Sequence, residues 1–227
     1  LQPRLRAAKL RDDTARVDLI DYVTQRNLDQ AQLNALALGQ WIAEHRTVLI
    51  TGPCGVAKSY IACALAHAAC RQDKAVLYFR MPQFLAELDN GHKTEQFDRV
   101  FNKIVRADAL ILDDWSSDIM TPAQRRNLME TIDARYERKA TVVTSQLPVD
   151  KWYDMIADPT LADAIVDHLV HRAHRISMDG PSMRKLRQAH PSAIGNLWIP
   201  HTFPLVTPFD FNHLLTKDWV DEMCTTH

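Results

Sequence analysis

Glycine is scarce in this chain, which contains only six glycines among its 227 residues. That share is well under half of the roughly 7% that is usual in globular proteins. Two of the six, Gly52 and Gly55, fall within one four-residue stretch. The scarce residue is therefore concentrated at one place, and no internal repeat or low-complexity tract accompanies it.

Long apolar runs are also absent. No segment approaches the ~18 to 20 consecutive apolar residues of a membrane span, and no charged-then-apolar secretory leader is present. The four cysteines show no C-x-x-C spacing, in a chain too large to depend on disulfides. We therefore expect a cytoplasmic protein with reduced thiols and no membrane partner. Because the sequence starts at Leu1 rather than methionine, it suggests a trimmed product.

The composition that remains is ordinary for a globular protein, with 46% apolar and 24% charged residues and a net charge of -1. The near-neutral charge excludes general affinity for polyanions but not a local basic face. Apolar strands alternate with helices after residue 28, which predicts an α/β fold with a parallel sheet covered by helices. Strands are expected at 47–51, 75–80, 109–112 and 141–145, and helices at 28–45 (capped by Asn27), 60–71, 82–106, 121–139, 148–156 and 159–172.

Three parts are predicted along the chain. Residues 1–27 form a basic arm, because residues 1–16 carry five basic and two acidic side chains with little apolar periodicity. Residues 28–187 form the core domain. Residues 188–227 are rich in proline and large aromatic side chains without a helical or strand period, and we expect this tail to be atypical and disordered.

A phosphate-binding loop is predicted between the first strand and the following helix. Backbone N–H groups of such a loop bind phosphate oxygens, its lysine (Lys58) reaches the β- and γ-phosphates, and its hydroxyl (Ser59) binds Mg²⁺. The second glycine of the motif is replaced by Ala57. The predicted nucleotide-binding residues of the loop are Gly52, Pro53, Cys54, Gly55, Val56, Ala57, Lys58 and Ser59.

Two carboxylates end the strand at 109–112. An ATPase needs one carboxylate to hold Mg²⁺, for which we select Asp113, and a second to polarise the attacking water, for which we select Asp114. Two solvated aspartates at a strand end are the alternative. Gln146 follows the next strand at the same sheet edge, where ligands bind in open parallel sheets. It could orient water or sense the γ-phosphate, or belong to a plain turn.

Several segments together resemble the IstB-like transposition helper ATPases, in the AAA+ group that also contains DnaC-type helicase loaders. The resemblance covers residues 4–187. The segments that carry it are Gly52 to Ser59, Leu110-Ile-Leu-Asp-Asp-Trp115, Thr144-Ser-Gln-Leu-Pro-Val149 and Gly180-x-Ser-Met-Arg-Lys185.

The resemblance implies an AAA+ P-loop NTPase with a small C-terminal helical portion. It implies an ATP-bound, ATP-hydrolysing homo-oligomer on duplex DNA that recruits or activates the transposase of its own mobile element. The resemblance also makes Arg184 a second nucleotide contact. The catalytic set is then Asp114, Lys58 and Gln146, with Mg²⁺ on Ser59 and Asp113.

The chain departs from the family pattern at Ala57, Ser116, Pro181 and His168. His168 replaces an arginine that, in the family, serves the nucleotide of a neighbouring subunit. Such an arginine contributes about 10³ to 10⁵ in rate, and a mostly neutral histidine is a poor substitute. Two alternatives therefore stay open: a degenerate, non-hydrolysing nucleotide-binding scaffold, and a DnaC-like helicase loader. The arm at 1–27 would be the remnant of a missing N-terminal region.

Other residue groups have structural alternatives. His168, His171 and His174 are spaced to share one helical face, which favours either a zinc site or a partly exposed surface. Basic clusters could meet DNA phosphates or simply be solvated, and no motif for reading bases is present. These clusters lie at 4–16, 125–126 and 172–187, whereas Cys63, Cys70, Trp41, Trp115 and Trp152 are expected to be packing residues.

Overall fold

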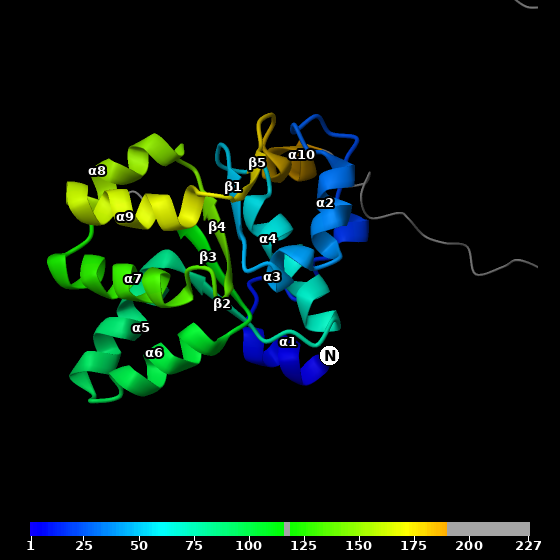
Figure 1. Ribbon diagram of the computed structural model, residues 1–227. Coiled ribbons are helices and arrows are strands. Elements are labelled where there is room, and N and C mark those ends of the chain that lie inside the picture. The colour runs from blue at the N-terminus through cyan, green and yellow to red at the C-terminus, as the bar shows by residue number, and fades with distance from the viewer. Residues whose placement is uncertain (116–118, 190–227) are drawn as a thin grey trace, which may run out of the picture. The chain divides into compact units, whose positions relative to one another are not determined.

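The computed structural model describes residues 1–115 and 119–189 and contains a five-stranded parallel sheet (Figure 1). The strand order is β2-β3-β4-β1-β5, and every pair of neighbours is parallel. The predicted α/β class is confirmed. The strands are β1 (Thr47–Thr51), β2 (Val76–Arg80), β3 (Ala109–Trp115), β4 (Ala140–Ser145) and β5 (His174–Ser177).

Helices cover both faces of this sheet (Figure 1). The helices with bounds are α1 (Gln2–Ala8), η1 (Val17–Leu19), α2 (Gln30–Ala37), α3 (Gln40–Ala43), α4 (Lys58–Arg71), α5 (Met81–Lys93), α6 (Phe97–Arg106), α7 (Pro122–Arg135), η2 (Val149–Lys151), α8 (Trp152–Ile156), α9 (Pro159–Val170) and α10 (Met183–Ala189).

Alternate side chains of each strand enter different cores. Val48 and Ile50 of β1 pack with α1 to α4, whereas Leu49 packs with α5 to α9 on the other face. Period-two alternation in a strand causes this division. Cys63 and Cys70 are buried in the first core, as expected. The three predicted tryptophans are buried as well, and the rings of Trp115 and Trp152 stack with centroids 4.5 Å apart.

The helix predicted at 28–45 is two helices, α2 and α3. The chain turns at Gly39, whose φ of 79° lies in the left-handed region that glycine adopts without strain. The predicted cap was also wrong, because Asp29 rather than Asn27 accepts the first backbone N–H groups of α2. Asn27 instead donates its side-chain amide to the Ser177 carbonyl at 2.9 Å.

The sequence did not predict β5, and the predicted helix at 159–172 continued beyond the end of α9. The helix ends at Val170, and His174 lies in a strand, so the three histidines do not share a helical face. Within residues 1–115 and 119–189, no group of three or more histidine, cysteine, aspartate or glutamate side chains could hold a metal ion. The zinc alternative therefore finds no support in the described part of the chain.

Residues 1–27 pack against the sheet domain. They form α1 and η1, and four of their apolar side chains enter the core beside α4. The buried members are Leu5, Ala8, Ala15 and Ile20. Ser116 and residues 190–227 lie outside the described residues. No helix of the described chain is long and apolar enough to cross a membrane.

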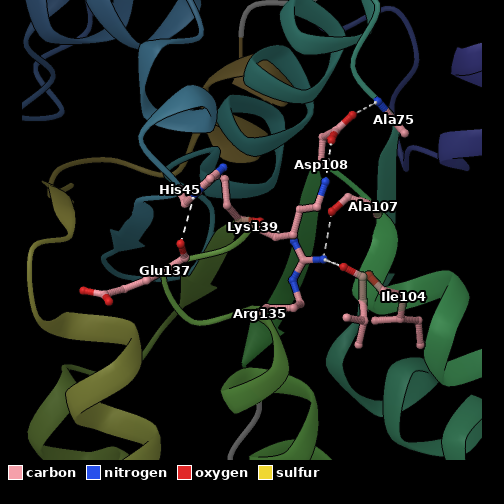
Figure 2. Close-up of polar contacts among 10 residues, drawn as sticks. His45, Ala75, Ile104, Ala107, Asp108, Arg135, Glu137 and Lys139 are labelled. Atoms are coloured by element: carbon pink, nitrogen blue, oxygen red, sulfur yellow. Dashed lines mark hydrogen bonds and ion pairs between the residues drawn. The ribbon is translucent and has the colours of Figure 1, made fainter.

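A buried arginine joins three elements at the sheet edge where the strands begin (Figure 2). Arg135, 1% exposed at the end of α7, donates to the carbonyls of Ile104 at 2.8 Å, Ala107 at 2.9 Å and Ala140. The Ile104 and Ala107 carbonyls lie in and just after the last turn of α6, where a helix leaves its final carbonyls without partners. The Ala140 carbonyl lies at the start of β4. Arg135 thus supplies the hydrogen bonds that fix α6 and β4 together.

Candidate functional site

The loop between β1 and α4 has a backbone that requires its two glycines. Gly52 has a φ of 147°, and a Cβ there would come within 2.3 Å of the Met178 carbonyl oxygen. Gly55 has a φ of 92°, and a Cβ there would meet the Ser182 hydroxyl at 2.3 Å. At Gly52 and Gly55, therefore, both conformation and close packing exclude a side chain.

Ala57 adopts a left-handed conformation, with φ 76° and ψ 30°, immediately before α4. An L-residue with a Cβ pays roughly 1–2 kcal/mol for this conformation, and glycine does not. We expect Ala57→Gly to raise the free energy of unfolding by about 0.5–1 kcal/mol, measured by urea denaturation. Ala68→Gly, inside α4, is the matched control and should lower stability by a similar amount. A decrease in stability with Ala57→Gly would contradict the prediction that the left-handed conformation of Ala57 is strained.

Lys58, the first residue of α4, folds back over the loop. Its ammonium donates to the carbonyls of Gly52 and Pro53, at 2.8 Å each, and the residue is 8% exposed. Burial lowers the pKa of Lys58, while nearby carboxylates of Asp113 and Asp114 oppose that shift. Both carbonyl partners are weak compared with a phosphate, so an anion entering the loop can take this ammonium from them.

Asp113 is fully buried at the end of β3. One carboxylate oxygen accepts a hydrogen bond from the Thr144 hydroxyl, and the other accepts one from the Tyr78 hydroxyl, each at 2.5 Å. Burial and the bond to this carboxylate raise the pKa of the Tyr78 phenol. These contacts come from β4 and β2, the two neighbours of β3, and hold the carboxylate in one orientation.

Asp114 is held in a different way and has a φ of 60°. Arg80, the last residue of β2, donates to one of its oxygens at 2.7 Å, and the Gln146 amide donates to the other at 3.1 Å. The hydrogen bond from Arg80 is the main cause of the lowered pKa of Asp114. The structure thus brings the three predicted residues of the sheet edge together and adds Arg80, which the sequence reading missed.

A cavity of about 680 Å³ connects these groups. The start of α10 reaches it because the Met183 N–H donates to the Gly55 carbonyl at 3.0 Å, which brings Arg184 to the cavity wall. Asp113 lies just outside the lining. The predicted site residues that line the cavity are Cys54, Gly55, Ala57, Lys58, Ser59, Asp114, Gln146 and Arg184.

The N-terminal segment supplies a wall of the cavity that the sequence reading did not assign. Arg26 is buried and donates to the Val56 carbonyl at 3.1 Å, so it stabilises the loop between β1 and α4. The signal that could have found it is a single arginine in a stretch whose other charged residues, Asp18, Asp21 and Asp29, are all acidic. The cavity-lining residues of this segment are Arg11, Asp12, Asp13, Leu19, Ile20, Asp21 and Arg26.

The donor set fits a nucleotide with a divalent cation. A hydroxyl from Ser59 and carboxylates from Asp113 and Asp114 are the hard oxygen ligands that Mg²⁺ prefers. The loop has left-handed residues at Gly52, Gly55 and Ala57 and leads into a helix of 14 residues, whose N-terminus favours an anion. The fit to a nucleotide with its cation therefore depends on these ligand oxygens and on the conformation of the loop, which lie at one end of the cavity.

His168 lies outside this cavity. Its ring stacks on that of Tyr136, with centroids 4.2 Å apart, in the last turn of α9. The stacking occupies one face of the imidazole, and the residue is half-buried. In this conformation His168 contributes to packing between α9 and the end of α7.

The fold and the loop define a P-loop protein of the AAA+ type. The structure of the helicase loader DnaC aligns with this one at a TM-score of 0.59 and 16% identity. The alignment covers 72% of this chain and 96% of the DnaC chain. The protein DnaI gives a TM-score of 0.61 and 17% identity over 78% of this chain and 94% of its own. At such low identity these likenesses concern the fold.

The family is narrower than this class. The model of the IstB-like ATP binding protein family matches residues 1–191, and the chain belongs to that family. An insertion sequence ATP-binding protein of Sinorhizobium fredii is 44% identical over 82% of this chain and 75% of its own length. A second relative, from an insertion sequence of Mycobacterium tuberculosis, is 31% identical over 81% of this chain and 73% of its own.

Proposed function

We propose that this protein is an ATP-binding and ATP-hydrolysing helper of DNA transposition. It would act in the cytoplasm as a homo-oligomer on duplex DNA and recruit or activate the transposase of its own mobile element. Membership of an ATP-binding family and relatives named from insertion sequences support this role. The observation that carries it is the convergence of Lys58, Asp114 and Gln146 on one cavity beside the phosphate loop.

The roles of the residues follow from their positions. Lys58 would leave its two carbonyl partners for the β- and γ-phosphates, and Arg184 would approach from α10. Ser59 and Asp113 would hold Mg²⁺, which neutralises charge developing on the phosphates. Asp114 would accept a proton from the attacking water, which Gln146 helps to orient. Arg80 must release Asp114 first, since both carboxylate oxygens are occupied.

The Arg80 contact yields a prediction for the catalytic step. Removing the guanidinium in Arg80→Ala frees one oxygen of Asp114 and raises the pKa of this carboxyl towards its ordinary value, which makes it a stronger base. We expect ATP turnover in the absence of DNA to rise by about three- to tenfold. The acid limb of the pH–rate profile should move to higher pH, and a limb that stays in place would argue against Asp114 as the base.

A basic surface on α6 supports the DNA part of the proposal. Arg99, Lys103 and Arg106 follow one another at i, i+4 and i+7, so they share a helical face, and all three are exposed. None of them joins an ion pair with another residue of the described ranges. Arg4 lies beside Lys103 and Arg106 around one shallow groove. Arg4 is paired with Asp73 at 2.8 Å, so among the described residues the cations of this surface that have no ion pair are the three of α6, and such cations favour contact with phosphates.

Neutralising this face should weaken DNA binding. For the triple variant Arg99→Gln, Lys103→Gln, Arg106→Gln we expect duplex affinity to fall at least about tenfold, and the slope of log affinity against log salt to shrink by up to about 2.7. The measurement is fluorescence anisotropy with labelled duplex at several salt concentrations. The control triple variant Arg71→Gln, Arg138→Gln, Lys151→Gln removes the same charge from scattered positions. Equal losses in both variants would exclude a specific surface.

The non-hydrolysing scaffold is the second candidate, favoured by the strained Ala57 and by the stacked His168. The decisive experiment measures ATP binding and hydrolysis with and without duplex DNA. The double variant Ala57→Gly, His168→Arg would gain turnover if these two residues limit the parent protein. No binding at millimolar ATP would exclude both candidates, and co-purification with a replicative helicase rather than a transposase would favour the loader.

A further inference from the structure

Arg11 places a positive charge against the buried carboxylate of Asp113. The guanidinium nitrogen Nη1 lies 3.7 Å from Asp113 Oδ2. The hydrogen-bond donors to this carboxylate, Tyr78 and Thr144, are both neutral hydroxyls. Among the described residues, Arg11 is the cation that forms an ion pair with Asp113. A partly exposed side chain, with 47% of its surface accessible, therefore neutralises a carboxylate that solvent does not reach.

The backbone around Arg11 fixes this contact. In the same segment Ala15 is buried, and the Arg16 N–H donates to the Tyr60 hydroxyl of α4 at 3.5 Å, next to the buried Cys63 side of that helix. Burial raises the pKa of the Cys63 thiol to about 11, so it stays uncharged. The Asp12 side chain accepts from the Thr14 N–H at 3.0 Å and from its hydroxyl at 2.7 Å. The segment at 9–16 thus rests on α4 in a defined conformation that presents Arg11 to the site.

Arg11 and a divalent cation compete for Asp113 in this arrangement. Like charges a few ångströms apart repel, and burial of the carboxylate strengthens that repulsion. A divalent cation carries twice the charge of a guanidinium. It also needs direct or water-mediated access to an oxygen of Asp113, and Arg11, which lines the cavity, lies 3.7 Å from Oδ2 of that carboxylate. Entry of the divalent cation therefore favours departure of Arg11.

We propose that Arg11 takes the place of the divalent cation at Asp113 in the nucleotide-free protein and is displaced by the metal-bound nucleotide. The segment at 9–16, between α1 and η1, then reports whether the site is loaded. This inference rests on the metal-binding role of Asp113 in the proposed function. It adds that the N-terminal segment moves in response to the cation rather than to the nucleotide alone.

The test compares dissociation constants for ATP measured with Mg²⁺ and with EDTA, by calorimetry on the whole chain. For Arg11→Gln we expect ATP to bind about two- to fivefold more tightly with Mg²⁺ and unchanged with EDTA. Arg16→Gln, which removes an arginine paired with Asp18 in the same region, should change neither value. Weaker binding of Arg11→Gln under both conditions would make Arg11 a phosphate ligand and overturn the proposal, as would equal affinities with and without the substitution.

Hydrogen–deuterium exchange gives a second measurement. Amides of residues 9–16 in the parent protein should exchange faster with Mg²⁺ and ATP present than with ATP and EDTA. Exchange that is the same in both conditions, while ATP binds normally, overturns this inference and leaves the proposed function standing. A parent protein that binds no ATP overturns the proposed function, and this inference with it.

Discussion

Replacing Lys58 with alanine is expected to weaken ATP binding by about 10- to 100-fold, because a charge-assisted hydrogen bond to phosphate contributes roughly 1.5–3 kcal/mol. The fold should survive, since Lys58 donates only to the carbonyls of Gly52 and Pro53, and loop residues can rebind water there. Removing a buried ammonium also relieves the desolvation that lowers the pKa of Lys58. The measurement is a binding isotherm with ATP and Mg²⁺ for both proteins.

Thermal stabilisation by the nucleotide separates binding from folding. A ligand at about 100 times its dissociation constant stabilises a protein by about 2.7 kcal/mol, and at the same ATP concentration this increment should fall to about 0.4–1.4 kcal/mol in Lys58→Ala. Lys151→Ala, which removes an exposed lysine on η2, is the matched control and should keep the full increment. An undiminished increment in Lys58→Ala would mean that ATP binds elsewhere.

Replacing Arg135 with methionine is expected to lower the free energy of unfolding by about 3–5 kcal/mol. The methionine stem fills much of the same space, so the loss comes from the acceptors at the end of α6 and the start of β4 (Figure 2). Each buried carbonyl left without a partner costs roughly 1–3 kcal/mol. Relief from burying a charge, which lowers the pKa of Arg135 to about 9, offsets only part of this.

Urea denaturation measures this effect, and two further variants separate its causes. Arg135→Lys keeps a charge but loses the planar fork that reaches several carbonyls at once, so its stability should be intermediate. Arg138→Met, at an exposed position three residues later, should change stability by less than about 0.5 kcal/mol. A loss below about 1 kcal/mol for Arg135→Met would show that water or backbone shifts satisfy these carbonyls.

The phosphate loop and the acidic pair could be predicted from sequence because their chemistry is local. Gly52 and Gly55 adopt positive φ values on the way into a helix, and Lys58 follows at a fixed spacing. Asp113 and Asp114 directly precede Trp115, the last residue of β3, so their position near the sheet edge follows from strand direction alone. The same reasoning placed Gln146, because parallel strands end at the same edge.

Strand β5 and the packing of residues 1–27 could not be predicted in this way. In β5 only Ile176 is buried, which leaves no alternation to distinguish a short edge strand from the end of the preceding helix. The segment at 1–27 carries its apolar side chains at irregular spacing, so its packing against α4 follows from the shape of the partner surface. The helical spacing of Arg99, Lys103 and Arg106 was visible in the sequence. It indicates a surface for phosphates only once the structure shows that this face of α6 is exposed.

The sequence by itself determined the fold class and placed the glycine-containing loop and the two aspartates at one edge of the sheet, since each depends on residues close together in the chain. Tertiary structure alone decided what holds the carboxylates in place. Arg80 stands opposite Asp113 in the β2–β3 register and pairs with Asp114, and Arg11 reaches Asp113 from a segment about a hundred residues away. Ion pairs form wherever folding brings charges within a few ångströms, and no local pattern encodes a partner at such separation.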